Sequence, residues 1–99
     1  MRVIVAGAGN VGSFLADDLS QSGHEVLVLE RDPALVGRLA AEYPAVTWRA
    51  GDACEIGVLS EAGTDEADVV VAATGDDEDN LVISLLAKQE FAVPRVVAR

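Results

Sequence analysis

The fold of this sequence is decided by the stretch Arg2-Val3-Ile4-Val5-Ala6-Gly7-Ala8-Gly9-Asn10-Val11-Gly12. Its first five residues form an almost continuous apolar run, as expected of a strand that is buried on both faces of a parallel sheet. Glycines then follow with the spacing G-x-G-x-x-G, and an amphipathic segment begins directly after them. A strand, this loop and a helix in that order are the fingerprint of a dinucleotide-binding α/β fold.

Each glycine of the loop has a distinct expected role. Gly7 allows a tight turn off the strand, Gly9 lets the backbone approach a pyrophosphate, and Gly12 lets the helix pack closely on the sheet. Backbone N–H groups and the positive end of the helix dipole then hold the anion without any lysine or arginine. The alternative is that the three glycines only shape a turn.

The chain is strongly acidic, with 17 acidic and 7 basic residues and a net charge of −10 over 99 residues. This balance argues against nucleic acid as a partner, because binding to phosphates needs clustered lysine and arginine. It argues equally against a membrane-surface role, and no apolar run approaches the roughly 20 residues that span a bilayer. Met1–Ala6 is too short for a signal peptide and Cys54 is the only cysteine, so a cytoplasmic protein without disulfides is expected.

The rest of the chain alternates short β-branched runs with amphipathic segments, which is typical of a parallel sheet with helices on both faces. Right-handed crossovers predict the strand order 3-2-1-4-5 of a Rossmann-like α/β fold. A sixth strand would follow Arg99, so residues 1–99 are expected to be one domain truncated from a longer chain. The predicted strands are 2–6, 25–29, 46–49 (at a sheet edge), 68–73 and 95–98, and the predicted helices end near 22, 43, 62 and 90.

Each helical segment is expected to bury one apolar face. Asp32-Pro33 is expected to cap the start of the second helix, and Gly23 to end the first in a left-handed conformation. The residues assigned to the buried faces are Val11, Phe14, Leu15 and Leu19, then Leu35, Val36, Leu39, Ala40 and Tyr43, and finally Leu81, Val82, Leu85 and Leu86.

Glu30 is the second element of a nucleotide site, since it ends the second predicted strand 18 residues after Gly12. A carboxylate there accepts hydrogen bonds from the ribose hydroxyls of adenosine and repels a 2′-phosphate, which favours NAD over NADP. Arg31 complicates this prediction, because a guanidinium beside the ribose could tolerate a phosphate or stack on adenine. The alternative for Glu30 is a solvated acid at a strand end.

Two further segments are predicted at the same edge of the sheet. Gly51-Asp52-Ala53 follows the third strand, where a side chain could reach the adenine amino group; capping of the next helix is an equal alternative for Asp52. Thr74-Gly75 follows the fourth strand, across the switch point from Gly9. The distal ribose and nicotinamide half of a dinucleotide would lie there.

Seven acidic residues and no basic residue lie between Asp65 and Asp79. Most of them crowd a predicted helix start, where carboxylates cap free N–H groups and complement the helix dipole. A hard-cation site for Ca²⁺, Mg²⁺ or Na⁺ is the alternative, although no full set of ligands can be read from the sequence.

Catalytic groups are not evident in this sequence. Tyr43 is not followed by lysine four places later, because Thr47 stands there, and His24 is the only histidine and precedes the second strand. Cys54 has no histidine partner in sequence. With no general base, nucleophile or metal cage, the chain is predicted not to be an enzyme.

The second half of the chain adds motifs that are more specific than the glycine loop. They are Gly51-Asp52-Ala53, Leu59-x-x-Ala62-Gly63 with Glu66-Ala67-Asp68, and Ala73-Thr74-Gly75-Asp76-Asp77-Glu78-Asp79-Asn80. In order and spacing, from Met1 to Arg99, the chain resembles the N-terminal domain of Trk-type potassium-uptake regulators, also called the RCK, KTN or TrkA-N domain.

This resemblance implies a cytoplasmic regulatory subunit that binds NAD(H), or ATP or ADP in some members. It implies assembly as dimers and rings beneath an integral-membrane potassium channel or transporter, at the inner face of the membrane and without insertion. Carried over by position, the pyrophosphate would be faced by Gly7, Gly9, Asn10 and Val11, the ribose by Glu30, adenine by Arg31 and Asp52, and the distal half by Thr74, with Asn80 near the helix start that borders the site.

Two other functions fit the fold alone. The first is the cofactor-binding half of an NAD-dependent oxidoreductase whose catalytic domain is missing, since this fold hosts many functions. The second is a purely structural dimerisation module.

Overall fold

A five-stranded parallel sheet in the order β3-β2-β1-β4-β5 forms the centre of a computed structural model that describes residues 1–99. The predicted strand order and the edge position of the third strand are confirmed, and every predicted strand end lies within one residue of its place in the structure. The strands are β1 (Arg2–Ala6), β2 (Glu25–Glu30), β3 (Thr47–Ala50), β4 (Val69–Ala72) and β5 (Arg95–Ala98). The segments between them are α1 (Asn10–Gln21), α2 (Pro33–Glu42), α3 (Ile56–Glu61), the 3-10 turn η1 (Thr64–Glu66) and α4 (Asp77–Gln89).

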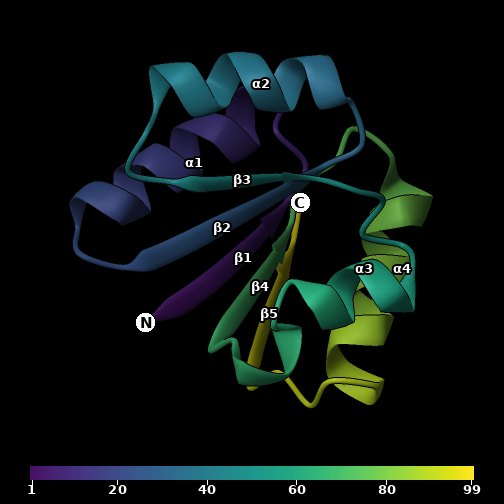
Figure 1. Cartoon of the computed structure of the whole chain (residues 1–99). Helices are drawn as coiled ribbons and strands as arrows, with labels where there is room; N and C mark the ends of the chain where they lie inside the picture. Colours follow the sequence, from purple (N-terminus) through teal and green to yellow (C-terminus); the bar gives the residue numbers. More distant parts are fainter.

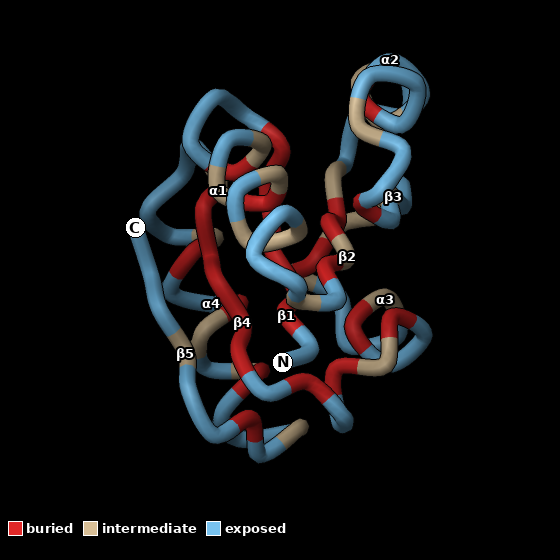
Figure 2. The backbone as a smooth tube through the Cα atoms, turned by 90° about the vertical axis from the view of Figure 1, so that its left-hand side faces the viewer, coloured by how far each residue is buried: buried red, intermediate tan, exposed pale blue.

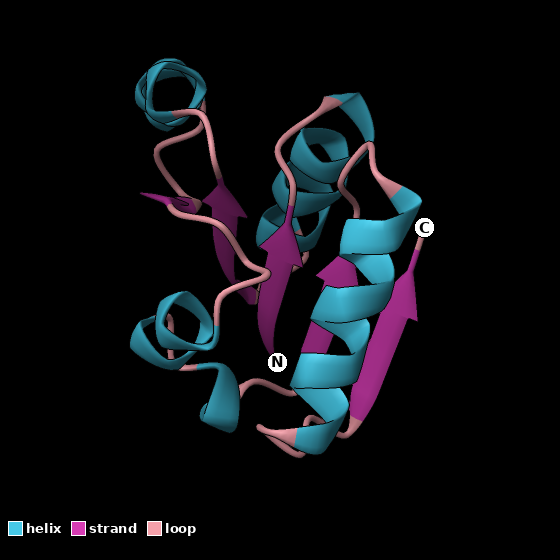
Figure 3. Cartoon of the chain, turned by 90° about the vertical axis from the view of Figure 1, so that its right-hand side faces the viewer, coloured by secondary structure: helices cyan, strands magenta, loops and turns pink.

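Helices cover both faces of the sheet, with α1 and α2 on one face and α3 and α4 on the other (Figures 1 and 3). The alternation of side chains along β1 separates two apolar cores. Val3 and Val5 belong to the core under α1 and α2, whereas Ile4 and Ala6 belong to the core under α3 and α4. Every residue of β4 is buried, and this strand runs through the interior of the molecule in Figure 2.

The predicted buried face of α1 is wrong for two residues. Val11 is 47% exposed and Phe14 is 75% exposed, whereas Gly12 and Ala16 are buried. The reason is that small residues at the inward positions bring the helix axis close to the sheet. Val11 and Phe14 therefore lie outward, whereas Leu15 and Leu19 pack partly against the core. In α2 the same correction applies to Ala40, which is exposed.

The predicted buried face of α4 is also wrong. Leu81, Val82 and Leu85 are exposed, and the inward positions are held by Asn80, Ile83 and Ala87, which recur at a helical spacing. A count of apolar residues favours the outer side of this helix, because its inner side includes a buried asparagine and an alanine. Only Leu86, of the four residues predicted, packs partly against the core.

The predicted helix ends are confirmed where capping chemistry was invoked. The side chain of Asp32 accepts a hydrogen bond of 3.0 Å from the N–H of Ala34, and Pro33 is the first residue of α2. Gly23 follows α1 with a φ of +92°. The cap of Asp32 stabilises the start of α2, and the left-handed Gly23 ends α1.

The β1–α1 loop is held by two contacts that exclude side chains. Gly7 has a φ of +105°, and a Cβ there would lie 2.8 Å from the backbone of Ala73 and Thr74. A Cβ on Gly12 would overlap the carbonyl oxygen of Gly7. The roles predicted for these two glycines in turning the chain and in close packing are therefore confirmed.

Gly12→Ala is expected to destabilise the fold by at least about 2 kcal/mol, because the new methyl group meets backbone that cannot move away. Gly37→Ala is the matched control, since Gly37 lies within α2 and a Cβ there meets nothing. That change is expected to stabilise the fold by about 0.5–1 kcal/mol through helix propensity. Urea unfolding measures both free energies, and equal effects of the two substitutions would contradict the packing role of Gly12.

Candidate functional site

A cleft lies at the carboxyl ends of the strands, where the residues predicted for adenosine come together. Its volume is about 70 Å³. The structure places six predicted residues in its lining, namely Gly7, Glu30, Arg31, Asp52, Ala53 and Thr74. Gly51, which belongs to the predicted segment 51–53, also lines the cleft, and four lining residues were not predicted for the site, namely Leu29, Cys54, Asp79 and Ile83.

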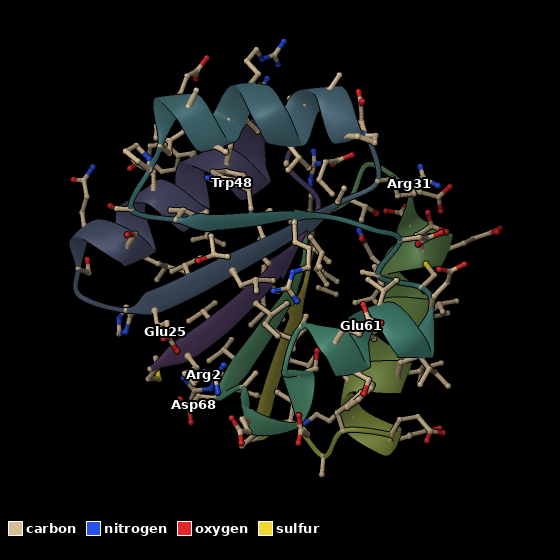
Figure 4. All side chains as sticks on the ribbon, viewed as in Figure 1. Arg2, Glu25, Arg31, Trp48, Glu61 and Asp68 are labelled. Carbon is tan, nitrogen blue, oxygen red and sulfur yellow. The ribbon has the colours of Figure 1, made fainter.

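A larger cavity of about 170 Å³ lies at the amino ends of the strands, and none of the predicted site residues lines it. Arg2 and Glu25 line it, and the Arg2 guanidinium forms ion pairs of 2.7 Å with Glu25 and 2.6 Å with Glu66. Figure 4 shows Arg2, Glu25 and Asp68 far from Arg31, which marks the carboxyl-end edge. The residues predicted to bind a nucleotide therefore lie at the smaller cleft and not at this cavity.

The start of α1 differs from the starts of the other long helices. It has no side-chain cap and no acidic residue in its first turn, whereas Asp32 caps α2 and Asp76 caps α4. The first N–H groups of a helix have no partner inside the helix. Accordingly, none of the hydrogen bonds of the chain uses the N–H of Gly9 or of Asn10, Val11 and Gly12.

Gly9 is set apart from its neighbours in the loop. Its φ of −70° and ψ of −170° suit any residue, and a Cβ at this position would meet nothing within 4 Å. Gly7 and Gly12 are required by the fold, but Gly9 is not. The absence of a side chain at Gly9 therefore adds to the open space beside the first turn of α1.

Glu30 is held by two backbone groups. Its Oε1 accepts a hydrogen bond of 3.0 Å from the N–H of Ala8, and its Oε2 accepts one of 2.8 Å from the N–H of Asp32. Glu30 is therefore a partly exposed acid at the end of β2 that two backbone groups fix in place. Each carboxylate oxygen keeps a second lone pair, so the group retains acceptor capacity toward the cleft.

Arg31 and Asp79 lie on two sides of the cleft. The Arg31 Nη1 atom is 3.8 Å from the Asp79 Oδ2 atom, and the Arg31 side chain is 68% exposed. An ion pair of this length and exposure contributes at most about 1 kcal/mol. The contact joins the end of β2 to the first turn of α4 and leaves the guanidinium free to turn.

Asp52 does not cap α3, so that alternative is wrong. Its Oδ1 accepts a hydrogen bond of 2.9 Å from the N–H of Cys54, and α3 begins only at Ile56, after Glu55 as its N-cap residue. Asp52 instead shapes the turn after β3 and lines the cleft. Ala53 is buried beside it.

Thr74 and Gly75 follow β4, as predicted, and Thr74 is tied to α4. Thr74 exchanges three hydrogen bonds with the side chain of Asn80, which is 2% exposed. Gly75 is exposed, and a Cβ there would meet nothing within 4 Å. The sequence placed Asn80 only near the start of the helix, so this set of bonds was not foreseen.

The acidic segment before α4 is used for capping. The Oδ1 atom of Asp76 accepts a hydrogen bond of 3.0 Å from the N–H of Asp79, and three acids occupy the first turn of the helix. The chain contains no group of three or more histidine, cysteine, aspartate or glutamate side chains arranged to hold a metal ion. No helix combines the length and the apolar character needed to cross a membrane.

Known proteins resemble the chain along its whole length. A family model described as the TrkA-N domain matches residues 3–99. The Trk system potassium uptake protein TrkA of Mycobacterium tuberculosis is 54% identical over 99 residues, which is 100% of this chain and 44% of that protein. A TrkA homolog from Methanothermobacter thermautotrophicus is 39% identical over 100% of this chain and 45% of its own length. The chain thus spans less than half the length of these relatives.

Two solved structures share the fold. The Kef CTD of Shewanella denitrificans, in an AMP-bound form, superposes with a TM-score of 0.84 at 28% identity, over 100% of this chain and 58% of that one. The NAD(P)-binding domain of an exopolyphosphatase-related protein from Archaeoglobus fulgidus gives a TM-score of 0.81 at 24% identity, over 96% and 70% of the two chains. The second likeness concerns the fold alone. From the glycine loop, the motif that follows β4 and the match over residues 3–99, the chain belongs to the TrkA-N domain family.

Proposed function

We propose that this chain is the nucleotide-binding regulatory domain of a Trk-type potassium-uptake protein. The observation that carries the proposal is Gly9, whose missing side chain serves no packing purpose within the fold. A glycine that the fold does not need, in front of unpaired helix N–H groups, suits the close approach of a phosphate. The ligand is an adenine nucleotide, with NAD(H) first and ATP or ADP as alternatives.

The adenosine half occupies the cleft in this proposal. Glu30 accepts the ribose hydroxyls, Arg31 and Asp52 lie beside adenine, and the phosphates meet the free N–H groups at the start of α1. The enclosed volume of about 70 Å³ is below the 300–1,000 Å³ of typical ligand pockets. Part of the nucleotide therefore lies over the open edge, with the distal half at Thr74 and Gly75.

Regulation follows from a shift between conformations of the full protein. A nucleotide that bridges β2 and α4 favours one arrangement of the domains and their neighbouring copies. An integral-membrane potassium transporter, bound at its cytoplasmic face, then responds to that arrangement. The names of the relatives and the absence of an activated nucleophile in the cleft support a regulatory role over an enzymatic one.

Calorimetric titration with NADH, NAD⁺, NADPH, ATP, ADP and AMP tests the proposal. At least one adenine nucleotide is expected to bind, and Gly9→Ala is expected to lower its affinity by about tenfold or more, because the methyl group occupies the phosphate's place. Gly37→Ala serves as the control with unchanged affinity. Thermal unfolding of Gly9→Ala is expected to match wild type. A wild-type chain that binds none of these nucleotides would refute the proposed function.

Glu30 is expected to set the preference between NADH and NADPH. Wild type binds NADH about tenfold more tightly or better, because the carboxylate repels a 2′-phosphate and accepts ribose hydroxyls. In Glu30→Gln the charge is removed, so the ratio of the two affinities falls toward one. Taking the ratio cancels any general loosening of the loop by the lost acceptor for Ala8 or Asp32. An unchanged ratio would show that Glu30 does not contact this part of the ligand.

Cys54 reports on the cleft through its thiol. Burial, followed by the nearby carboxylates of Asp52 and Asp79, raises its pKa from 9.0 to about 11. At pH 8 the folded chain therefore holds about 100-fold less thiolate than the urea-unfolded chain, and alkylation by iodoacetamide slows in proportion. The folded rate is expected to rise about tenfold per pH unit between pH 7 and 9, and saturating nucleotide lowers it further. Equal rates in folded and unfolded chains would contradict this environment.

A further inference from the structure

Asn80 stands at a position where the fold alone favours an apolar residue. It is the first of the three inward positions of α4, followed by Ile83 and Ala87, and it is 2% exposed. Thr64 is the only other buried polar side chain. A buried amide costs free energy unless its hydrogen bonds are satisfied, so its partners reveal what the residue does.

Every hydrogen bond of the Asn80 amide goes to Thr74. The Asn80 Oδ1 atom accepts from the Thr74 N–H at 3.0 Å and from the Thr74 hydroxyl at 2.6 Å, and the Asn80 Nδ2 group donates to the Thr74 carbonyl at 3.1 Å. The Thr74 Oγ1 atom also accepts from the N–H of Asp76 at 3.2 Å. Thr74 is thus fixed through its N–H group, its carbonyl oxygen and its hydroxyl.

Thr74 therefore has no free N–H or hydroxyl proton to offer a ligand. The next donor along the loop is the N–H of Gly75, which forms no hydrogen bond within the chain. Gly75 resembles Gly9, because its φ is not in the left-handed region and a Cβ would meet open space. The backbone of Thr74 also packs against Gly7, so the Gly75 loop and the glycine loop are neighbours.

We propose that Asn80 is the positioning residue for the distal half of a dinucleotide. By fixing Thr74 on α4, it holds the free N–H of Gly75 toward the phosphate and ribose beyond the adenosine half. The inference rests on the proposed function. It adds the residue that sets the affinity for a dinucleotide relative to the affinity for a mononucleotide. AMP needs only Glu30, Asp52 and the start of α1, which Asn80 does not touch, whereas NADH needs both loops.

The experiment compares NADH and AMP by calorimetry on wild type and three variants of this chain. Asn80→Leu keeps the branched shape of the side chain and removes all three bonds to Thr74. Asn80→Asp keeps the size and the acceptor, removes the donor to the Thr74 carbonyl and adds a buried negative charge. Ser84→Ala is the matched control, because Ser84 lies one turn later on α4 and its hydroxyl bonds only the carbonyl of Asn80.

Asn80→Leu is expected to lower the affinity for NADH by about tenfold while the affinity for AMP changes by less than about twofold, as for the loss of one well-placed hydrogen bond. Asn80→Asp is expected to show a loss in the same direction, larger for NADH than for AMP, and it carries the test if thermal unfolding shows that Asn80→Leu does not fold. Ser84→Ala is expected to match wild type for both nucleotides.

Equal losses for NADH and AMP would overturn the inference, because they would show that Asn80 only stabilises the fold. So would an unchanged affinity for NADH, or a wild type that binds AMP as tightly as NADH. In all three cases wild type still binds a nucleotide, so the proposed function stands. A wild type that binds neither NADH nor AMP would overturn this inference, and the proposed function falls with it only if NAD⁺, NADPH, ATP and ADP also fail to bind.

Discussion

The contact between the β1–α1 loop and the ends of the central strands is the constraint on which the rest of the structure depends. Gly7 turns with a positive φ against the backbone after β4, and Gly12 packs on the carbonyl of Gly7 with no room for a side chain. This packing sets the first turn of α1 directly at the carboxyl end of the sheet. The contacts that hold the fold together therefore also place the unpaired N–H groups of that helix start beside the cleft.

In this acidic chain, the groups suited to an anion are the unpaired backbone N–H groups at the start of α1 rather than lysine or arginine side chains. Asp32 and Asp76 each accept an N–H at the start of α2 and of α4, so those helix dipoles are already neutralised in part. No carboxylate does this for α1. A net charge of −10 is compatible with the proposed anion site, because the interaction of an anion with backbone N–H groups is local and directional.

The strand order and strand ends could be predicted because buried parallel strands have short apolar sequences, bounded here by turns with glycine and aspartate. The helix faces could not, because Ala16 and Ala87 bury small surfaces that a count of apolar residues undervalues, while Phe14 and Leu81 turn outward. Cleft residues were predicted where a strand end dictates position, as at Glu30 and Asp52. Side-chain hydrogen bonds between separate segments, such as those of Ala8 with Glu30 and of Thr74 with Asn80, could not be predicted. They depend on how the segments pack in three dimensions, which a local sequence pattern does not show.

The strands under the two sides of the cleft are joined through β1, but the side chains of the two sides make few contacts with one another. Glu30 braces the β2 side through Ala8 and Asp32, and Asn80 braces the β4 side through Thr74. Across the cleft, the side-chain contacts are the exposed Arg31–Asp79 pair at 3.8 Å and a long bond of 3.9 Å from the Cys54 thiol to the Asp79 carbonyl. Such contacts are worth about 1 kcal/mol or less, which is comparable with the 1–3 kcal/mol of a typical allosteric coupling. A ligand bound as in the proposed function would therefore add contacts between side chains that the fold itself joins only weakly.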